Sequence, residues 1–523
     1  MKKIAPHFLV LALLLPGGPA RADELFWRLI APPKFHEEIP FHEPVLDAEG
    51  KLLPWTSYDR VMALSMDFIA ACPRDGATGL PWYEQYSDFR APDMEPEQWP
   101  HNPAGLYGMM VETVARYWAY TGERKWIELA RHPLDHLIAE STPPDFAWPR
   151  VPYASADNSG HYRGGSHEGI DGIEPDKVGQ AGAGYVRFYQ LTGEEKYLRE
   201  AEHCAEVLAE KMRPGDARHS PWPFRVNART GKALEEYTSE VIWPVTLFDE
   251  LMALGRDREG KYGEAREAAW TWLMAYPMRT MKWKGYFEDV VRDPGNFNRD
   301  QYTPGEVARY LMRRPEADPE WRAHVPMLLG WIKQTLGDTR GKWRGATAVR
   351  EQRFCMQVAS SHTARYASLC AMWHAAGGGP EWREDALRSF ALATYLSRGD
   401  GIVIFSIADP DVWFSDGYFD YVPHFLDGMG ALPELAPEGE DHLLSSSTII
   451  REVRYQPGRI EYEAFDAEGT ETLRLSFIPR RVMAEGREME LRAGEGAGAG
   501  AWFDPALGAL RVRRSGVRRI VIE

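Results

Sequence analysis

A short turn motif that recurs between stretches of helical periodicity constrains the fold of this chain more than any other feature. Thr121-Gly122-Glu123 is followed about seventy residues later by Thr192-Gly193-Glu194. In each copy the glycine stands where a helix ends in a left-handed conformation, and the glutamate after it favours the first turn of another helix. Each copy therefore predicts the tip of a helical hairpin.

Helical periodicity flanks both tips and continues along the chain. Apolar side chains recur every three or four residues from Leu106 to Tyr117, and again from Tyr197 to Leu208. Weaker hairpins have tips near residues 256–261, 314–318 and 377–380, a helix over 57–72 precedes them, and a closing helix is expected at 416–431. The pattern predicts about twelve helices arranged as repeated hairpins.

Three glycines interrupt the helical pattern between Lys177 and Phe188, at Gly179, Gly182 and Gly184. Each costs a helix about 1 kcal/mol relative to alanine, which close approach of a neighbouring helix would justify. A charged, amphipathic helix is expected at 194–212, as on the outside of a ring. The sequence thus distinguishes crowded inner helices from outer ones.

The character of the sequence changes after Leu432. A segment bearing proline and glutamate is followed by apolar residues at every second position, as in Ile460 and Tyr462, and again in Leu473 and Leu475. This alternation is typical of half-buried strands. We expect a linker at 433–444 and a small β-sandwich domain with a structural role at 445–523.

The N-terminus has the three parts of a secretory signal peptide. Lys2 and Lys3 form a basic start, an apolar run extends from Phe8 to Leu15, and small residues stand at Ala20 and Ala22. We expect residues 1–22 to be removed and the mature chain to be soluble, either periplasmic or secreted. An uncleaved anchor is the alternative, although no segment approaches the roughly 20 apolar residues of a membrane helix.

Charge and cysteine content exclude several classes of protein. A formal net charge of −16 argues against a nucleic-acid partner, whose phosphates require basic patches. Four cysteines without C-x-x-C spacing form neither a zinc site nor a disulfide scaffold, so we interpret them as buried thiols, with a bridge between distant hairpins left open.

Motifs for metal or nucleotide cofactors are not found either. The sequence contains no H-E-x-x-H, Walker A, G-x-G-x-x-G or G-x-S-x-G motif. Structural calcium at His167, Glu168, Asp171, Glu174 and Asp176 is an alternative, but their spacing is not that of a known calcium loop. We expect no cofactor and no metal.

Long connections alternate with the short tips and should all lie on one rim. They cover residues 141–176, 213–237, 278–302, 337–357 and 399–416, far above the usual length for helix bundles. Their aromatic, amide and charged side chains suit a sugar, because rings stack on sugar faces while polar groups hold hydroxyls. The expected binding residues in these loops are Trp148, Tyr153, His161, Arg163, Trp222, Tyr237, Trp283, Tyr286, Asn298, Gln301, Tyr302 and Trp413. The alternative is that the aromatic residues merely hold the loops in place.

On the two tips, the glycine-rich helix and the aromatic loops, residues 57–432 resemble the (α/α)6-toroid carbohydrate-active enzymes, the six-hairpin glycosidase-like superfamily. The resemblance implies a mainly α fold, a toroid of helical hairpins over 23–432, followed here by the β-sandwich domain. It also implies a hydrolase, a polysaccharide lyase or a sugar epimerase, and leaves the reaction open.

Glycosidic cleavage needs two carboxyl groups, which we expect from two different loops. The first candidates are Glu288 and Asp289 in the aromatic loop 278–302, with a structural role in binding Arg292 or Arg299 as the alternative.

A second candidate set comprises Asp416, Asp420 and His424, whose spacing would place them on one helical face, where repulsion raises a carboxyl pKa. The alternatives are an N-cap for Asp416 and a buried structural histidine for His424.

A third candidate set faces the same rim and comprises Glu236, Tyr237, Glu240, Glu351 and His362. His362 with Arg365 could hold a uronate carboxylate or act as the base of a lyase, and a structural hydrogen-bond cluster is the alternative.

We therefore expect a glycoside hydrolase acting on an oligo- or polysaccharide. The alternatives are a lyase or epimerase acting on uronates, indicated if Arg163, His362 and a tyrosine converge on one pocket, and a glycan-binding protein without catalysis.

Overall fold

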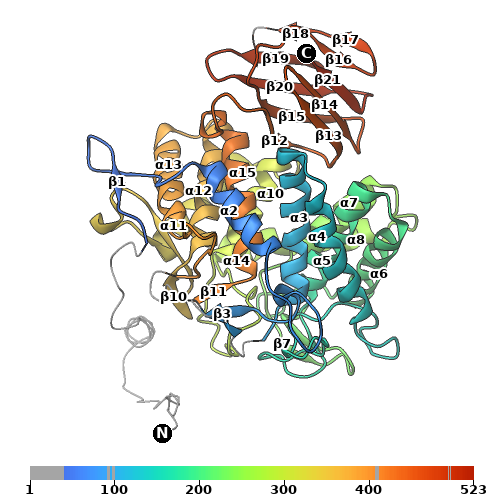
Figure 1. Cartoon of the computed structure of the whole chain (residues 1–523). Helices are drawn as coiled ribbons and strands as arrows, with labels where there is room; N and C mark the ends of the chain where they lie inside the picture. The colour runs from blue at the N-terminus through green and yellow to red at the C-terminus, as the bar shows by residue number, and fades with distance from the viewer. Residues whose placement is uncertain are drawn as a thin grey trace.

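The computed structural model describes residues 41–90, 95–96, 100–406, 412–492, 494, 496 and 498–523, so the expected signal peptide lies outside the described residues. Figure 1 shows a ring of helices, coloured from blue to orange, and a separate β domain in red at its upper end. Within the described part of the chain, no helix is both long and apolar enough to cross a membrane.

Six pairs of helices form the ring. The inner helices are α3 (Pro103–Thr121), α5 (Pro175–Thr192), α7 (Ile242–Ala253), α10 (Tyr302–Arg313), α12 (Ser360–Ala375) and α15 (Val422–Ala431). The outer helices are α4 (Lys125–Ala139), α6 (Glu195–Lys211), α8 (Lys261–Ala275), α11 (Trp321–Leu336), α13 (Pro380–Thr394) and α2 (Tyr58–Ala70). Successive inner helices contact one another, and α15 contacts α3, which closes the ring and confirms the (α/α)6 toroid.

The hairpin tips have the predicted geometry. Gly122 after α3 and Gly193 after α5 have φ angles of 75° and 79°, and their N–H groups donate to the carbonyls of Trp118 and Tyr189. Only glycine adopts this left-handed conformation without steric cost, so the two tips end their helices as the sequence indicates.

The glycines of α5 lie where helices approach closely. A Cβ at Gly179 would lie 2.5 Å from the nitrogen of Pro244 in α7, and one at Gly182 would lie 2.6 Å from Leu247. On the other side, Gly108 of α3 could not carry a Cβ either, because Gln180 of α5 would lie 2.7 Å away. Close contact with both neighbours therefore explains this glycine content.

The closing helix predicted at 416–431 is divided in two. α14 (Asp416–Phe419) ends before Asp420, and α15 begins with Pro423 in its first turn, a position that proline favours. Asp420 thus lies between two helices, and the expected single helical face through Asp416, Asp420 and His424 does not form.

Short strands and turns order the long connections on the rim opposite the tips. Three small sheets form there, made of β3 (Asp88–Arg90), β4 (Glu95–Pro96) and β11 (Val412–Phe414), of β5 (Gly172–Ile173), β6 (Arg225–Asn227) and β7 (Ala233–Glu235), and of β8 (Gly337–Asp338), β9 (Ala348–Gln352) and β10 (Cys355–Val358). The hairpin β1 (Val45–Leu46) and β2 (Leu52–Leu53) packs on α13, and one-turn helices lie in the connections at α9 (Pro277–Thr280), η1 (Trp82–Glu84) and η3 (Gly341–Trp343). A further one, η2 (Pro315–Ala317), forms the tip between α10 and α11.

Two five-stranded sheets make up the C-terminal domain, after η4 (Pro433–Leu435). Their strand orders are β12-β15-β20-β19-β18 and β13-β14-β21-β16-β17. The strands are β12 (His442–Ser446), β13 (Ile450–Gln456), β14 (Arg459–Ala464), β15 (Gly469–Arg474), β16 (Val482–Ala484), β17 (Arg487–Met489), β18 (Leu491–Arg492), β19 (Gly500–Asp504), β20 (Ala509–Arg514) and β21 (Arg519–Ile522). The first strand begins at His442, inside the segment predicted as a linker.

The β domain covers the tip rim of the toroid. β12 contacts α3 and α15, and Arg451 donates a hydrogen bond of 2.7 Å to the carbonyl of Gln190, beside the second tip. Figure 1 shows the domain above the ends of α3 and α15, away from β3, β7, β10 and β11. The rim that carries the long loops is therefore the rim left open.

Candidate active site

A cavity of about 430 Å³ opens on the loop rim. Most of its described lining comes from the loops around β3, after α9, at β9–β10 and before α15, which are far apart in the sequence, and the ends of inner helices such as α12 complete it. Five carboxyl groups line it: Asp88, Glu288, Asp289, Glu351 and Asp420. Four of the expected catalytic or binding acids are thus brought together in one place.

Glu351 is held in β9 with 5% of its surface exposed. Burial raises the pKa of its carboxyl to about 7, and the negative charge of Glu288 contributes to the rise. Gln352 donates a hydrogen bond of 2.9 Å to its Oε1. Glu351 can therefore keep a proton near neutral pH, as a general acid must.

Glu288 lies in a different loop and differs in its surroundings. Its carboxylate accepts no hydrogen bond from the residues that the structure describes, although 8% of the residue is exposed and it lines the cavity. The Nζ of Lys177, in the first turn of α5, places a positive charge 3.8 Å from its Oε2. The carboxyl group of Glu288 can therefore form a hydrogen bond with a molecule bound in the cavity.

Tyr286 and Tyr302 line the cavity, but their ring faces are not available to stack on a sugar. Their rings stack with centroids 3.4 Å apart, and the Nζ of Lys177 lies 3.0 Å from the centroid of Tyr286. The amide of Gln180 donates to the hydroxyl of Tyr302 at 3.0 Å and accepts from that of Tyr286 at 3.3 Å. Both tyrosines line the cavity, but their ring faces are engaged within the protein.

Phenylalanine provides the aromatic surface that the sequence interpretation assigned to tyrosine and tryptophan. Phe287, Phe354, Phe405 and Phe414 all line the cavity and are only partly buried. The rings of Phe405 and Phe414 meet edge to face with centroids 4.9 Å apart. Sequence alone does not mark these phenylalanines as binding residues, because phenylalanine is also common in protein cores.

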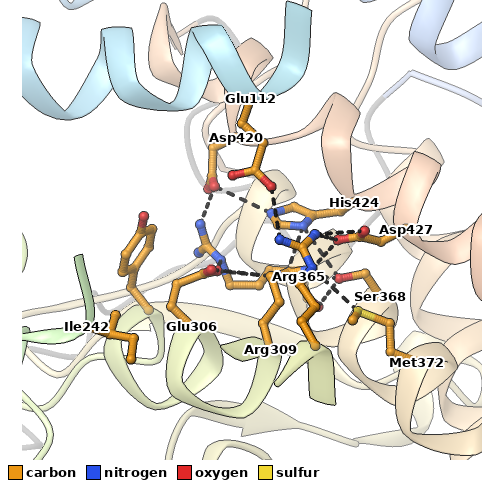
Figure 2. A network of polar contacts seen from close by, with 12 residues as sticks. Glu112, Ile242, Glu306, Arg309, Arg365, Ser368, Met372, Asp420, His424 and Asp427 are labelled. Atoms are coloured by element: carbon orange, nitrogen blue, oxygen red, sulfur yellow. Dashed lines mark hydrogen bonds and ion pairs between the residues drawn. The ribbon is translucent and has the colours of Figure 1, made fainter. Parts of the chain in front are cut away.

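Asp420 belongs to a buried network of ion pairs. Arg365 donates to its Oδ1, and His424 lies 3.4 Å from the same oxygen. Burial alone would raise the pKa of Asp420, but the charge of Arg365 and the hydrogen bond from His424 hold it well below its usual range. Figure 2 shows Arg365 and Arg309 close together, with Asp420, Glu306 and Asp427 around them.

Other predicted binding residues are buried away from the cavity. The indole of Trp222 donates to the carbonyl of Leu208 at 2.9 Å, and the hydroxyl of Tyr237 donates to that of Lys282 at 2.9 Å. Trp148, Tyr153 and Trp283 are each at most 4% exposed. These five aromatic residues hold the loops, which is the alternative that the sequence left open.

The remaining candidates divide between surface and interior. His161 and Arg163 are exposed, and His161 lies beside Glu140. Because Arg163 is on the surface and His362 is buried, the two do not converge on one pocket. Asn298 donates to Gln352 at 2.8 Å and Gln301 accepts from Arg365 at 3.3 Å, both below the surface.

Glu240 lies outside the cavity lining, and burial raises its pKa well above the usual range. For Asp416 and Trp413, the structure describes only the backbone, in α14 and β11.

The acids proposed as a calcium site are engaged separately. Glu174 pairs with Arg225 at 3.0 Å, Asp171 pairs with Arg229 at 2.8 Å, and Glu168 accepts from Ser155. Among the described residues, no group of three or more acids, histidines or cysteines is arranged to hold a metal ion. The four cysteines are free thiols.

Comparison of the sequence with models of protein families finds no match, and comparison with curated proteins finds none. Solved structures are similar in fold. Cellobiose 2-epimerase from Spirochaeta thermophila is 13% identical with a TM-score of 0.52, over 72% of this chain and 96% of that chain. A D-mannose isomerase is 10% identical with a TM-score of 0.52, over 72% and 96%.

A third similar structure, cellobiose 2-epimerase from Bacillus thermoamylovorans, is 10% identical with a TM-score of 0.50, over 70% of this chain and 97% of that chain. The neighbours are carbohydrate-active enzymes, and the likeness establishes the (α/α)6 toroid that this chain shares with them. At such low identity the fold does not identify the reaction.

Proposed function

We propose that the protein is a glycoside hydrolase in which Glu351 is the general acid and Glu288 is the general base. The observation that carries the proposal is the contrast between two carboxyl groups from separate loops that face one cavity. Glu351 retains a proton because it is buried, whereas Glu288 lies beside a lysine and takes no hydrogen bond from the described protein. Such a contrast between neighbouring carboxyl groups is typical of glycosidase acid and base assignments.

The proposed reaction assigns one proton transfer to each carboxyl group. Glu351 transfers its proton to the glycosidic oxygen as the bond from that oxygen to the anomeric carbon breaks. A water molecule attacks the anomeric carbon and gives a proton to Glu288. The phenylalanine rings that line the cavity stack on sugar rings at either side of the bond.

The charge of the cavity favours a neutral glycan. Among its described lining residues are five acids and neither lysine nor arginine. A uronate carboxylate would be repelled there, because Arg163 lies on the surface and Arg365 is already bound to Asp420 and Glu306. This argues against a lyase or epimerase acting on uronates.

Epimerisation or isomerisation of a neutral sugar is the second candidate. Two observations favour it: the imidazole of His362 lines the cavity, and two of the proteins with a similar fold are an epimerase and an isomerase.

The raised pKa of Glu351 argues against a glycan-binding protein without catalysis. Such a protein would not require a buried carboxyl that keeps its proton near neutral pH.

We also propose that the protein is exported after loss of residues 1–22, on the strength of the N-terminal sequence alone. Mass spectrometry of the protein from the periplasm or medium should find Asp23 as the first residue. A chain that retains residues 1–22 would contradict the proposal.

The activity is tested by incubating the mature protein with neutral and uronate-containing polysaccharides and separating the products. Shorter saturated sugars support hydrolysis, ultraviolet-absorbing unsaturated ends support a lyase, and isomers of unchanged length support an epimerase. Glu288→Gln should lower kcat by about 10²–10⁴-fold. The matched control is Glu128→Gln, an exposed acid of the outer helix α4 paired with Arg131, which should leave kcat unchanged.

A further inference from the structure

Two buried histidines near the cavity are each contacted by an arginine at the same ring nitrogen. The Nη1 of Arg365 lies 3.1 Å from Nδ1 of His362, and the Nη2 of Arg309 lies 3.1 Å from Nδ1 of His424. His362 and His424 are 6% and 4% exposed. Figure 2 shows His424 beside Arg309 and Arg365, in the middle of the network.

These contacts determine which ring nitrogen carries the hydrogen. A guanidinium group only donates hydrogen bonds, so each Nδ1 must be the unprotonated acceptor. The hydrogen of each neutral ring is then on Nε2. For His424 this N–H points to Oδ1 of Asp420 at 3.4 Å. For His362 the described residues offer no partner to Nε2, and the ring lines the cavity.

We infer that His362 is a neutral hydrogen-bond donor to the sugar through Nε2–H, and that Arg365 and Arg309 are positioning residues that fix both histidines in this state. The inference rests on the proposed function and deepens it, because it assigns a substrate contact to His362. It also denies His362 the role of a base, since the lone pair that would accept a proton is occupied by Arg365.

The charged groups that face the two rings are of both signs: Arg365 and Arg309 favour the neutral state, and Asp420, whose Oδ2 lies 3.8 Å from Nδ1 of His362, opposes it. His362 faces Arg365 on its own helix, Asp420 before α15 and His424 on α15, and the ring of Phe287 packs against it. Burial and Arg365 lower its pKa to about 3, although Asp420 opposes the change. For His424, burial and Arg309 lower the pKa to about 4 against the hydrogen bond with Asp420.

The arginines themselves are held so that they cannot turn away. Arg309 also donates to Glu306 on its own helix, to Asp427 on α15 and to Oγ of Ser368 on α12 at 3.1 Å. Arg365 also donates to Glu306, Gln301 and Asp420. Because each guanidinium group is bound on several sides, the donor to each Nδ1 stays in place.

The protonation state is measured directly by ¹⁵N NMR of the histidine rings in the full chain, between about pH 5.5 and 7.5. We expect two rings with Nε2–H and an unprotonated Nδ1 that do not titrate in this range. His362→Gln and His424→Gln assign them, and the exposed ring of His161 provides a reference. Nδ1–H or a doubly protonated ring at either position would overturn the inference. This measurement is independent of any activity, so it stands even if the protein proves not to be a hydrolase.

Kinetics then separate a donor from a base. Glutamine at position 362 still offers an N–H group, so His362→Gln should lower kcat/KM by less than about tenfold and His362→Ala by about 100-fold. A loss of about 1,000-fold or more with both variants would show proton transfer and refute the donor role.

Arg309→Met tests the positioning role by the same NMR measurement. It should leave the signal of His362 unchanged but give His424 a mixture of ring forms. An unchanged His424 signal would remove Arg309 from the mechanism.

Discussion

Replacing Glu351 by glutamine should remove activity and at the same time stabilise the protein at alkaline pH. Glutamine keeps the shape of the side chain but can neither donate a proton nor ionise. The usual pKa of glutamate, 4.5, is raised to about 7 here. Each pH unit corresponds to about 1.4 kcal/mol, so the folded protein binds this proton about 3 kcal/mol more tightly than the unfolded chain does.

The direction in which the free energy of unfolding changes with pH depends on whether the folded or the unfolded state binds the proton more tightly. Because the folded pKa is the higher one, the stabilisation is complete below about pH 4.5 and is lost as the pH rises to about 7. The variant has no such loss at this position. Its free energy of unfolding, relative to the natural protein, should therefore increase by about 3 kcal/mol between pH 5 and pH 8.

Urea unfolding followed by tryptophan fluorescence at both pH values measures the change. Glu84→Gln is the matched control that separates the effect on stability from the effect on activity. Burial raises the pKa of Glu84 to about 7 too, yet its side chain is outside the cavity lining. Glu351→Gln should lower kcat by at least about 100-fold. The natural protein should lose kcat/KM above about pH 7, as Glu351 ionises. An equal pH dependence of stability in Glu351→Gln and the natural protein would refute the reasoning.

Three further predictions concern the cavity wall, the helix contact and the β domain. Phe414→Ala should raise KM by about 3–10-fold with little change in kcat, and an unchanged KM in steady-state kinetics would exclude a stacking role for this ring. Gly108→Ala places a Cβ 2.7 Å from Gln180 and 2.9 Å from its backbone oxygen, so thermal denaturation should show a loss of about 1–3 kcal/mol, whereas unaltered stability would mean that α3 and α5 separate easily. Arg514→Met leaves Glu471 buried without the guanidinium group that binds it at 2.8–2.9 Å, and calorimetry should show the β domain destabilised by roughly 3–5 kcal/mol while initial rates at low temperature stay the same.

Much of the fold could be predicted from local sequence, because hairpin tips are local structures. Gly122 and Gly193 have the left-handed backbone that the Thr-Gly-Glu motifs indicate, and Gly179 and Gly182 mark a close helix contact that needs no knowledge of the partner. The break at Asp420 was missed although Pro423 follows it closely, because the apolar spacing continues through the break.

The candidate site was only partly predictable. The sequence could indicate that Glu288, Glu351 and Asp420 come from loops on one rim, because the alternation of short and long connections determines the side of the ring. It could not distinguish an aromatic ring that faces the cavity from one that holds a loop. Trp222 and Phe405 differ only in which partners the folded chain brings to them, and the role of Arg309 depends on three helices meeting.

The helix pair that closes the ring joins the beginning and the end of the toroid sequence. α2 pairs with α15, and the rings of Tyr58 and Phe425 lie 5.4 Å apart although α15 is among the last toroid elements in the sequence. During synthesis a chain that has left the ribosome as far as α13 lacks both the last inner helix and Asp420. Such a nascent chain has an open ring with an incomplete cavity, so the candidate site should be complete only near the end of translation.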